Sequence, residues 1–128
     1  MPVIGIGGVF FRAQDPKALT AWYDTHLGIG PGHNGTGAKS GESWYWQTQA
    51  GPSIFAPFKA ATDYWPEGKS YMLNFRVTGL TALLASLRTA GIEVETRAEW
   101  DTPETGRFAR VHDPEGNPVE LWEPPEGS

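Results

Sequence analysis

An internal repeat is the feature of this 128-residue chain that most constrains its fold. The segment "FRAQDPKALTAWYDTHLGI" (residues 11–29) aligns with "FRVTGLTALLASLRTAGI" (residues 75–92), and the two share Phe-Arg at the start and Gly-Ile at the end. They are offset by 64 residues at the first phenylalanine and by 63 at the last isoleucine. A unit of this length exceeds a solenoid repeat but is too small to bury its own sheet. We therefore expect two similar modules that pack together.

Glycine, proline and apolar spacing divide the first half of the chain into a strand, a helix and a hairpin. Residues 3–13 are rich in Val, Ile, Phe and Gly, which suits a strand that another backbone or a ligand approaches closely. Asp15 and Pro16 predict the start of a helix that ends at Gly28. The glycine-rich residues 28–41 predict a mobile loop that can serve as a lid or be a plain surface loop. The predicted hairpin strands are residues 42–49 and 53–58.

The second half repeats this plan, and its last two predicted strands meet at the turn "PEGN". The predicted elements are a strand at 70–77, a helix at 81–91, and strands at 92–100, 106–113 and 117–124. The chain then forms one domain over 1–128. Its modules cover about 3–58 and about 70–124, and residues 59–69 connect them, since this segment carries aromatic side chains that a flexible linker lacks.

Composition excludes several kinds of site and partner. The chain has no cysteine, which excludes disulfides, thiolate metal sites and cysteine nucleophiles. Ten Lys and Arg stand against fifteen Asp and Glu without any basic run, so we expect neither nucleic acid nor a membrane surface as a partner. The apolar start "MPVIGIGGVFF" is too short to span a bilayer and lacks a basic leader. We expect a soluble, cytoplasmic protein.

Two motifs carry a family resemblance that covers essentially the whole chain. The first half contains D-P-x-x-L-x-x-W-Y-x-x-x-L-G, and the second half ends with D-P-x-G-N-x-x-E-L-W. Their residues are Asp15, Pro16, Leu19, Trp22, Tyr23, Leu27 and Gly28, then Asp113, Pro114, Gly116, Asn117, Glu120, Leu121 and Trp122. With these motifs at the ends of an internal repeat, the chain resembles the vicinal oxygen chelate superfamily, which includes glyoxalase I, bleomycin-resistance proteins, fosfomycin-resistance enzymes and extradiol dioxygenases.

The resemblance implies an α+β fold in which tandem βαβββ modules form a curved, mostly antiparallel sheet around a cleft, with the helices outside. It also implies a small-molecule ligand in that cleft. Relatives commonly dimerise by pairing or swapping modules, so the resemblance further implies a homodimer.

The metal site that the resemblance implies lacks most of its ligands in this sequence. The superfamily holds a divalent metal with His or Glu side chains on inner strand faces. The corresponding positions here are Gly8, Met72 or its neighbour Leu73, Phe55 or its neighbour Ala56, and Glu120. Only Glu120 is a donor, and one carboxylate does not hold a divalent metal usefully. We therefore expect no metal and no other cofactor.

The three histidines do not supply the missing ligands. We expect His26 to lie in the last turn of the first helix, where its partial positive charge suits the helix terminus. His33 falls in the glycine loop, either exposed or reaching a pocket as part of a lid. His112 precedes the Asp113 turn and is the nearest of the three to Glu120, with which it can form at best a weak metal site.

Strand alternation predicts which side chains face the cleft. Glu120 shares its face with Pro118 and Trp122, whereas Val119 and Leu121 point to the opposite face, against a helix. Applied to the other strands, the same reasoning predicts an aromatic wall with a few polar groups, which suits a flat or apolar organic ligand. The candidate ligand-binding residues are Phe10, Arg12, Trp44, Trp46, Phe55, Met72, Asn74, Arg76 and Trp122.

Each of these candidates also has a purely structural interpretation. Aromatic and Met side chains on an inner face can be simple core or dimer packing. Arg12 and Arg76 occupy matching places in the repeat and can neutralise Glu120 or a ligand carboxylate, or each can extend outward to solvent at the rim of the sheet.

Three functions follow from these observations. The first is a metal-free binding protein of the bleomycin-resistance type that takes a small aromatic or hydrophobic molecule. The second is a metal-independent lyase or isomerase with Glu120 as its catalytic general acid or base, its pKa raised by apolar neighbours. The third is a metal-dependent lyase or dioxygenase of the family whose ligands lie elsewhere in the chain.

Overall fold

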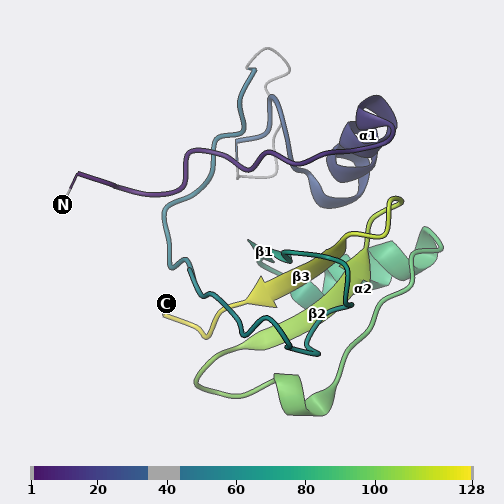
Figure 1. The fold of residues 1–128 in the computed structure, drawn as a ribbon. Coiled ribbons are helices and arrows are strands. Elements are labelled where there is room, and N and C mark those ends of the chain that lie inside the picture. The colour runs from purple at the N-terminus through teal and green to yellow at the C-terminus, as the bar shows by residue number, and fades with distance from the viewer. Residues whose placement is uncertain (1, 35–43, 128) are drawn as a thin grey trace.

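The computed structural model describes residues 2–34 and 44–127, and within them an α+β fold with one mixed sheet (Figure 1). The elements are α1 (Pro16–Leu27), β1 (Leu73–Arg76), α2 (Leu80–Thr89), the 3-10 turn η1 (Ala98–Trp100), β2 (Arg107–His112) and β3 (Pro118–Glu123). The last strand, β3, lies at the centre, parallel to β1 and antiparallel to β2. The α+β class is therefore confirmed, but this sheet is mixed rather than mostly antiparallel.

The helix predicted after Asp15 is confirmed with both of its ends. The Asp15 carboxylate accepts a hydrogen bond from the backbone N–H of Ala18, and Pro16 occupies the first turn, where no backbone donor is needed. At the other end Gly28 adopts a left-handed conformation, with φ of 65°, and donates to the carbonyl of Asp24. These local signals fix α1 without help from the rest of the fold.

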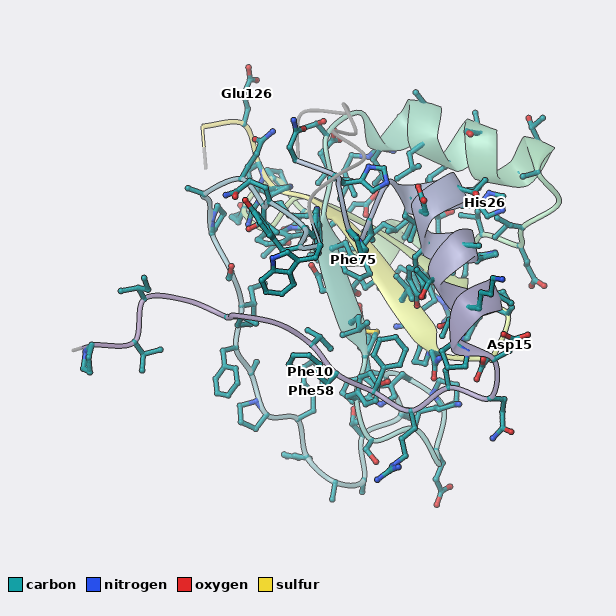
Figure 2. All side chains as sticks on the ribbon, turned by 90° about the horizontal axis from the view of Figure 1, so that it is seen from above. Phe10, Asp15, His26, Phe58, Phe75 and Glu126 are labelled. Atoms are coloured by element: carbon teal, nitrogen blue, oxygen red, sulfur yellow. The ribbon has the colours of Figure 1, made fainter. Side chains whose placement is uncertain are left out.

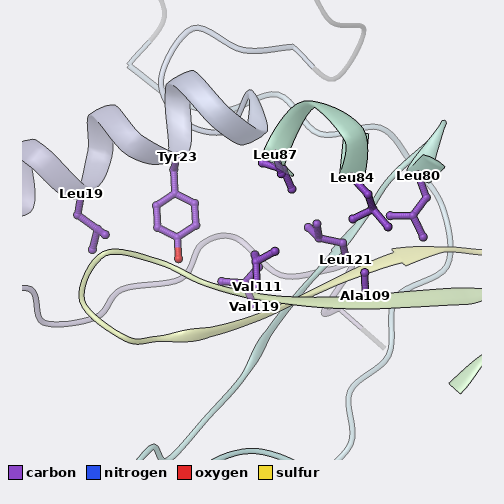
Figure 3. Packing of buried hydrophobic residues seen from close by; sticks show 9 residues of the cluster. All are labelled: Leu19, Tyr23, Leu80, Leu84, Leu87, Ala109, Val111, Val119 and Leu121. Atoms are coloured by element: carbon purple, nitrogen blue, oxygen red, sulfur yellow. The ribbon is translucent and has the colours of Figure 1, made fainter. Parts of the chain in front are cut away.

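The core lies between one face of the sheet and the two helices (Figure 3). Its fully buried centre is formed by alternate residues of β2 and β3, as strand alternation predicts. Both helices add apolar side chains from one stripe of their surface. The cluster consists of Leu19 and Tyr23 from α1, Leu80, Leu84 and Leu87 from α2, and Ala109, Val111, Val119 and Leu121 from the sheet. Each fully buried leucine stabilises the fold by about 1.5–3 kcal/mol.

The D-P-x-G-N motif ties the β2–β3 turn to α1. The buried Asp113 carboxylate accepts hydrogen bonds from the backbone N–H groups of Glu115 and Asn117, at 2.9 and 3.0 Å, and from the Tyr23 hydroxyl of α1, at 2.7 Å. The Glu115 carboxylate in turn accepts from the backbone N–H groups of Gln14 and Asp15, at 2.6 and 3.0 Å. The motif therefore serves as the joint between the two halves of the repeat.

The first half departs from the predicted plan. Within residues 2–34 and 44–72 the structure contains α1 but no strand, so the strands predicted at 3–13, 42–49 and 53–58 are not formed there. Glycines and prolines in these segments lower their tendency to form strands, and a strand also needs a paired neighbour. Figure 2 shows the N-terminal segment running away from α1 and the sheet.

The second half differs from the predicted elements at one strand. The strand predicted at 92–100 is reduced to an isolated bridge between Glu95 and Arg110, followed by η1. Half of the predicted glycine loop at 28–41, residues 35–41, lies outside the described part of the chain. No helix in the described ranges is long and apolar enough to cross a membrane.

Candidate functional site

Glu120 lies at the middle of the central strand, on the face of the sheet opposite the core. It is only 6% exposed, and both carboxylate oxygens have a partner. Its Oε2 accepts a hydrogen bond from the Tyr64 hydroxyl, and its Oε1 accepts one from Asn74 Nδ2 of β1 at 2.8 Å. These two donors offset the cost of burying the carboxylate.

Arg110 on β2 is the register partner of Glu120 and is equally buried, at 4% exposure. Its guanidinium carbon lies 4.9 Å from the ring centre of Tyr64 and 5.4 Å from that of Trp100, which is cation–π geometry. Its Nη2 donates to the backbone carbonyl of Tyr64 at 2.9 Å. Its Nε is buried and has no partner. We call Tyr64, Asn74, Trp100, Arg110 and Glu120 the Glu120 cluster.

The Glu120 cluster holds Tyr64 firmly in its protonated form. Burial first, and then the hydrogen bond to Glu120 and its negative charge, raise the pKa of Tyr64 to about 12 against the opposing effect of the nearby Arg110. At neutral pH the Tyr64 hydroxyl is therefore a hydrogen-bond donor and not a base.

Tyr64 reaches the cluster from the connecting segment 59–69, which crosses over the polar face of the sheet. Its ring stacks on Phe58, with centroids 5.8 Å apart, and the Phe58 ring also contacts Trp65. The Trp65 indole N–H donates to the carbonyl of Lys69 at 2.8 Å. The connecting segment therefore covers Glu120 with an aromatic layer.

A second feature, an open recess of about 2300 Å³, lies between the sheet and the extended segments of the first half. We call it the aromatic recess. Many of the predicted ligand-binding residues line it, whereas Glu120, Arg110 and Tyr64 do not. Those residues are Phe10, Trp44, Trp46, Met72, Asn74 and Arg76. Pockets for single drug-sized ligands have volumes of about 300–1,000 Å³, so one small molecule would leave most of this recess empty.

The remaining predicted ligand-binding residues lie elsewhere. Arg12 is exposed, and Phe55 is 90% exposed and outside the aromatic recess. Trp122 is buried, stacks on Phe108 with centroids 6.2 Å apart, and donates its indole N–H to the Thr105 carbonyl at 2.7 Å. These contacts give Trp122 a structural role.

The predicted pairing of an arginine from the repeat with Glu120 is not found in the described residues. Arg76 instead donates to the backbone carbonyls of Gln49 and Pro52, at 2.6 and 2.7 Å. Its guanidinium packs on Gly51 so closely that an added Cβ there would lie 2.7 Å from it. Arg76 therefore holds the predicted hairpin turn against β1. Tyr64 and Asn74 are the partners of Glu120, a place that one of the two alternatives gave to arginine.

The donor set does not fit the divalent metal of the superfamily. In residues 2–34 and 44–127 no three His, Cys, Asp or Glu side chains are grouped so that they could hold a metal. Both Glu120 oxygens are hydrogen bonded and a guanidinium lies nearby, which disfavours a second cation. The histidines lie apart from Glu120: the His26 ring contacts Trp22, His33 pairs with Asp24 at 2.8 Å, and His112 is exposed at the end of β2.

Sequence reasoning missed three members of the Glu120 cluster: Tyr64, Trp100 and Arg110. A signal for Arg110 was present, because it stands between Ala109 and Val111 as Glu120 stands between Val119 and Leu121. Two opposite charges at mid-strand in a predicted hairpin indicate a cross-strand pair. Tyr64 and Trp100 come from irregular segments, and no periodic pattern points to them.

Two helices on one face of a mixed sheet, with the D-P-x-G-N-x-x-E strand at its centre, define an α+β protein of the glyoxalase type. The glyoxalase-like domain family matches residues 8–122, so the chain belongs to this family and, with it, to the vicinal oxygen chelate superfamily.

One solved structure extends this comparison. The chain is similar to TnmS3, an antibiotic binding protein from Streptomyces sp. CB03234, with a TM-score of 0.55 and 20% identity over 97% of this chain and 98% of that one. At this level of identity the likeness supports the fold alone. No curated protein matches the chain.

Proposed function

We propose that this protein binds a small aromatic or hydrophobic molecule without a metal. The observation that carries the proposal is the aromatic recess, where Phe10, Trp44 and Trp46 supply ring surface and Asn74 and Arg76 supply polar groups. Aromatic walls with a few polar contacts are typical of sites for flat organic ligands. TnmS3, which has a similar fold, is an antibiotic binding protein, and this agrees with a role of this kind.

The proposal includes a homodimer built from tandem βαβββ modules around a curved sheet. Most of the exposed large apolar side chains belong to the first half, among them Ile4 at 100%, Phe10 at 95% and Trp44 at 85% exposure. A second copy that paired with these extended segments would complete the first module, over about 3–58, and reduce the open recess to the size of one ligand.

The two enzymatic alternatives have less support. A general acid or base must reach a reacting proton, but Glu120 lies beneath Tyr64 with both oxygens hydrogen bonded and does not line the aromatic recess. A metal-dependent lyase or dioxygenase would need donors that the described residues do not bring together.

Equilibrium dialysis with 2-methoxynaphthalene tests the proposed function. We expect the wild type to bind this probe and Trp46→Ala to weaken binding about tenfold, because a ring contact in the recess is lost. Val3→Ala is the control, since Val3 is an exposed apolar residue that does not line the recess, and it should bind as the wild type does. A wild type that binds neither this probe nor related planar aromatics would overturn the proposal.

A further inference from the structure

We propose that Tyr64 occupies the place of a phenolic ligand in the Glu120 cluster. The ligand is a hydroxy-aromatic compound whose hydroxyl donates to Glu120 and whose ring lies against Arg110 once Tyr64 has moved away. This inference rests on the proposed function, aromatic small-molecule binding, names the class of ligand, and places the ligand at the Glu120 cluster, of which Asn74 lines the aromatic recess whereas Glu120, Arg110 and Tyr64 do not.

The contacts of Tyr64 define what the site recognises. Its hydroxyl donates to Glu120 Oε2, its ring lies 4.9 Å from the Arg110 guanidinium carbon, and its centroid is 6.0 Å from that of Trp100 in an edge arrangement. A free phenol can make all three contacts. Asn74 occupies the other Glu120 oxygen, so the carboxylate is already oriented toward one incoming donor.

Arg110 provides an independent indication of a ligand. Its Nε is buried without a partner, although the residue is only 4% exposed. An unpaired buried donor is unfavourable, and on a charged group it is more so. The Tyr64 hydroxyl donates to Glu120, and in this arrangement the Nε of Arg110 has no acceptor. A free phenol can place its oxygen to accept from Arg110 while it donates to Glu120, since a hydroxyl does both.

Tyr64 is placed on a part of the chain that can move. It belongs to the connecting segment 59–69, which contains no helix or strand and lies on the surface. Among the described residues, three hydrogen bonds join this segment to the sheet and its turn: Arg110 donates to the Tyr64 carbonyl, the Tyr64 hydroxyl donates to Glu120, and Lys69 donates to Asn117 at 3.4 Å. The others lie within the segment, among them Tyr64 N–H to Thr62 and Trp65 to the Lys69 carbonyl. Both Glu120 and Arg110, by contrast, are fixed on paired strands. Glu120 and Arg110 therefore belong to regular structure, whereas the segment that covers them does not.

A matched pair of probes tests the inference by equilibrium dialysis: 2-naphthol, which has the donor hydroxyl, and 2-methoxynaphthalene, which lacks it. Tyr64→Phe removes the competing bond to Glu120 and keeps the ring. A hydrogen bond to a charged group corresponds to roughly tenfold or more in affinity, so we expect this variant to bind 2-naphthol about tenfold more tightly than the wild type. Its affinity for 2-methoxynaphthalene should not change.

Glu120→Gln combined with Tyr64→Phe is the second variant, and it should lose the gain for 2-naphthol because the charged acceptor is gone. Thermal unfolding of each variant shows whether it is folded. Unchanged 2-naphthol affinity in Tyr64→Phe, or an equal gain for both probes, would overturn the inference and leave the aromatic recess as the binding site. Absence of binding of either probe to any folded variant would instead overturn the proposed function together with the inference.

Discussion

Glu120 and Arg110 are charged residues that are buried within strands and therefore need polar partners. Each is buried at mid-strand on the face opposite the core, and the two are register partners across β2 and β3. Yet no ion pair joins them within the described residues. Instead Tyr64 lies between them, with its hydroxyl toward Glu120 and its ring under Arg110. A sequence pattern places such charges on a face, but their partners come from segments that the pattern does not describe.

Gly106 is a single residue whose backbone conformation and close contact both require glycine. It has φ of +99°, and an added Cβ would lie 2.2 Å from the Glu123 carbonyl oxygen. We expect Gly106→Ala to lower the free energy of unfolding by about 3 kcal/mol or more, because the left-handed strain of about 1–2 kcal/mol is joined by a backbone clash. Urea unfolding followed by circular dichroism measures the change.

Gly68 is the matched control for this substitution. It has a similar φ of +93°, but nothing lies within 4 Å of an added Cβ. Gly68→Ala should therefore show the strain of about 1–2 kcal/mol and no more. Equal losses in the two variants would show that the contact with Glu123 does not contribute.

At the scale of elements, local signals predicted the helices and failed for several strands. The start of α1 at Asp15 and its end at Gly28 need only their own neighbours, and both were correct. The strands β2 and β3 were also found, because Asp113 and its turn bring them together locally. Residues 3–13 are as rich in strand-forming residues but have no paired neighbour in this structure. The strand predicted there from composition alone was therefore wrong.

Tyr23 gives a prediction about how α1 is joined to the sheet. Burial, and then the hydrogen bond and charge of Asp113, raise the pKa of Tyr23 well above its ordinary value near 10.0. The folded chain therefore keeps this proton at a pH at which the unfolded chain releases it. The resulting stability is fully present below pH 10 and is lost as the pH rises above it.

We expect Tyr23→Phe to reduce the alkaline loss of stability. Above pH about 10 the free energy of unfolding of the wild type should fall more steeply than that of the variant, by up to about 1.36 kcal/mol per pH unit for one proton. At neutral pH the variant should be less stable by about 1.5–3 kcal/mol, because a hydrogen bond to a charged group is lost. Urea unfolding at several pH values measures both effects.

The exposed Tyr45 provides the comparison for Tyr23. It is 48% exposed, and its ring contacts Trp44 rather than the core. Tyr45→Phe should keep the wild-type stability at neutral pH and the wild-type slope above pH 10. An alkaline slope that Tyr23→Phe does not change would contradict the role given to the Tyr23–Asp113 bond.

At the scale of the whole molecule, the two halves of the repeat differ in how well they are packed. The second half forms the sheet and most of the core, whereas the first half contributes α1 and a series of extended, apolar, exposed segments. Exposed apolar surface of this extent is unusual in a soluble monomer and is typical of an interface. The sequence predicted these segments to be strands, but in the described residues they have no paired neighbouring strand.

The proposed homodimer can be tested through Phe55, which is 90% exposed and lies outside the aromatic recess. We expect sedimentation equilibrium to give the wild type twice the 14.0 kDa mass of one chain. Phe55→Asp should shift it to the monomer at micromolar concentration, because removal of an aromatic anchor and burial of an unpaired charge together weaken an interface by about 2–5 kcal/mol. Ala85→Asp, on the exposed side of α2, should leave the dimer intact. A wild type that sediments as a monomer, or the same mass for both variants, would contradict an interface on the first half of the chain.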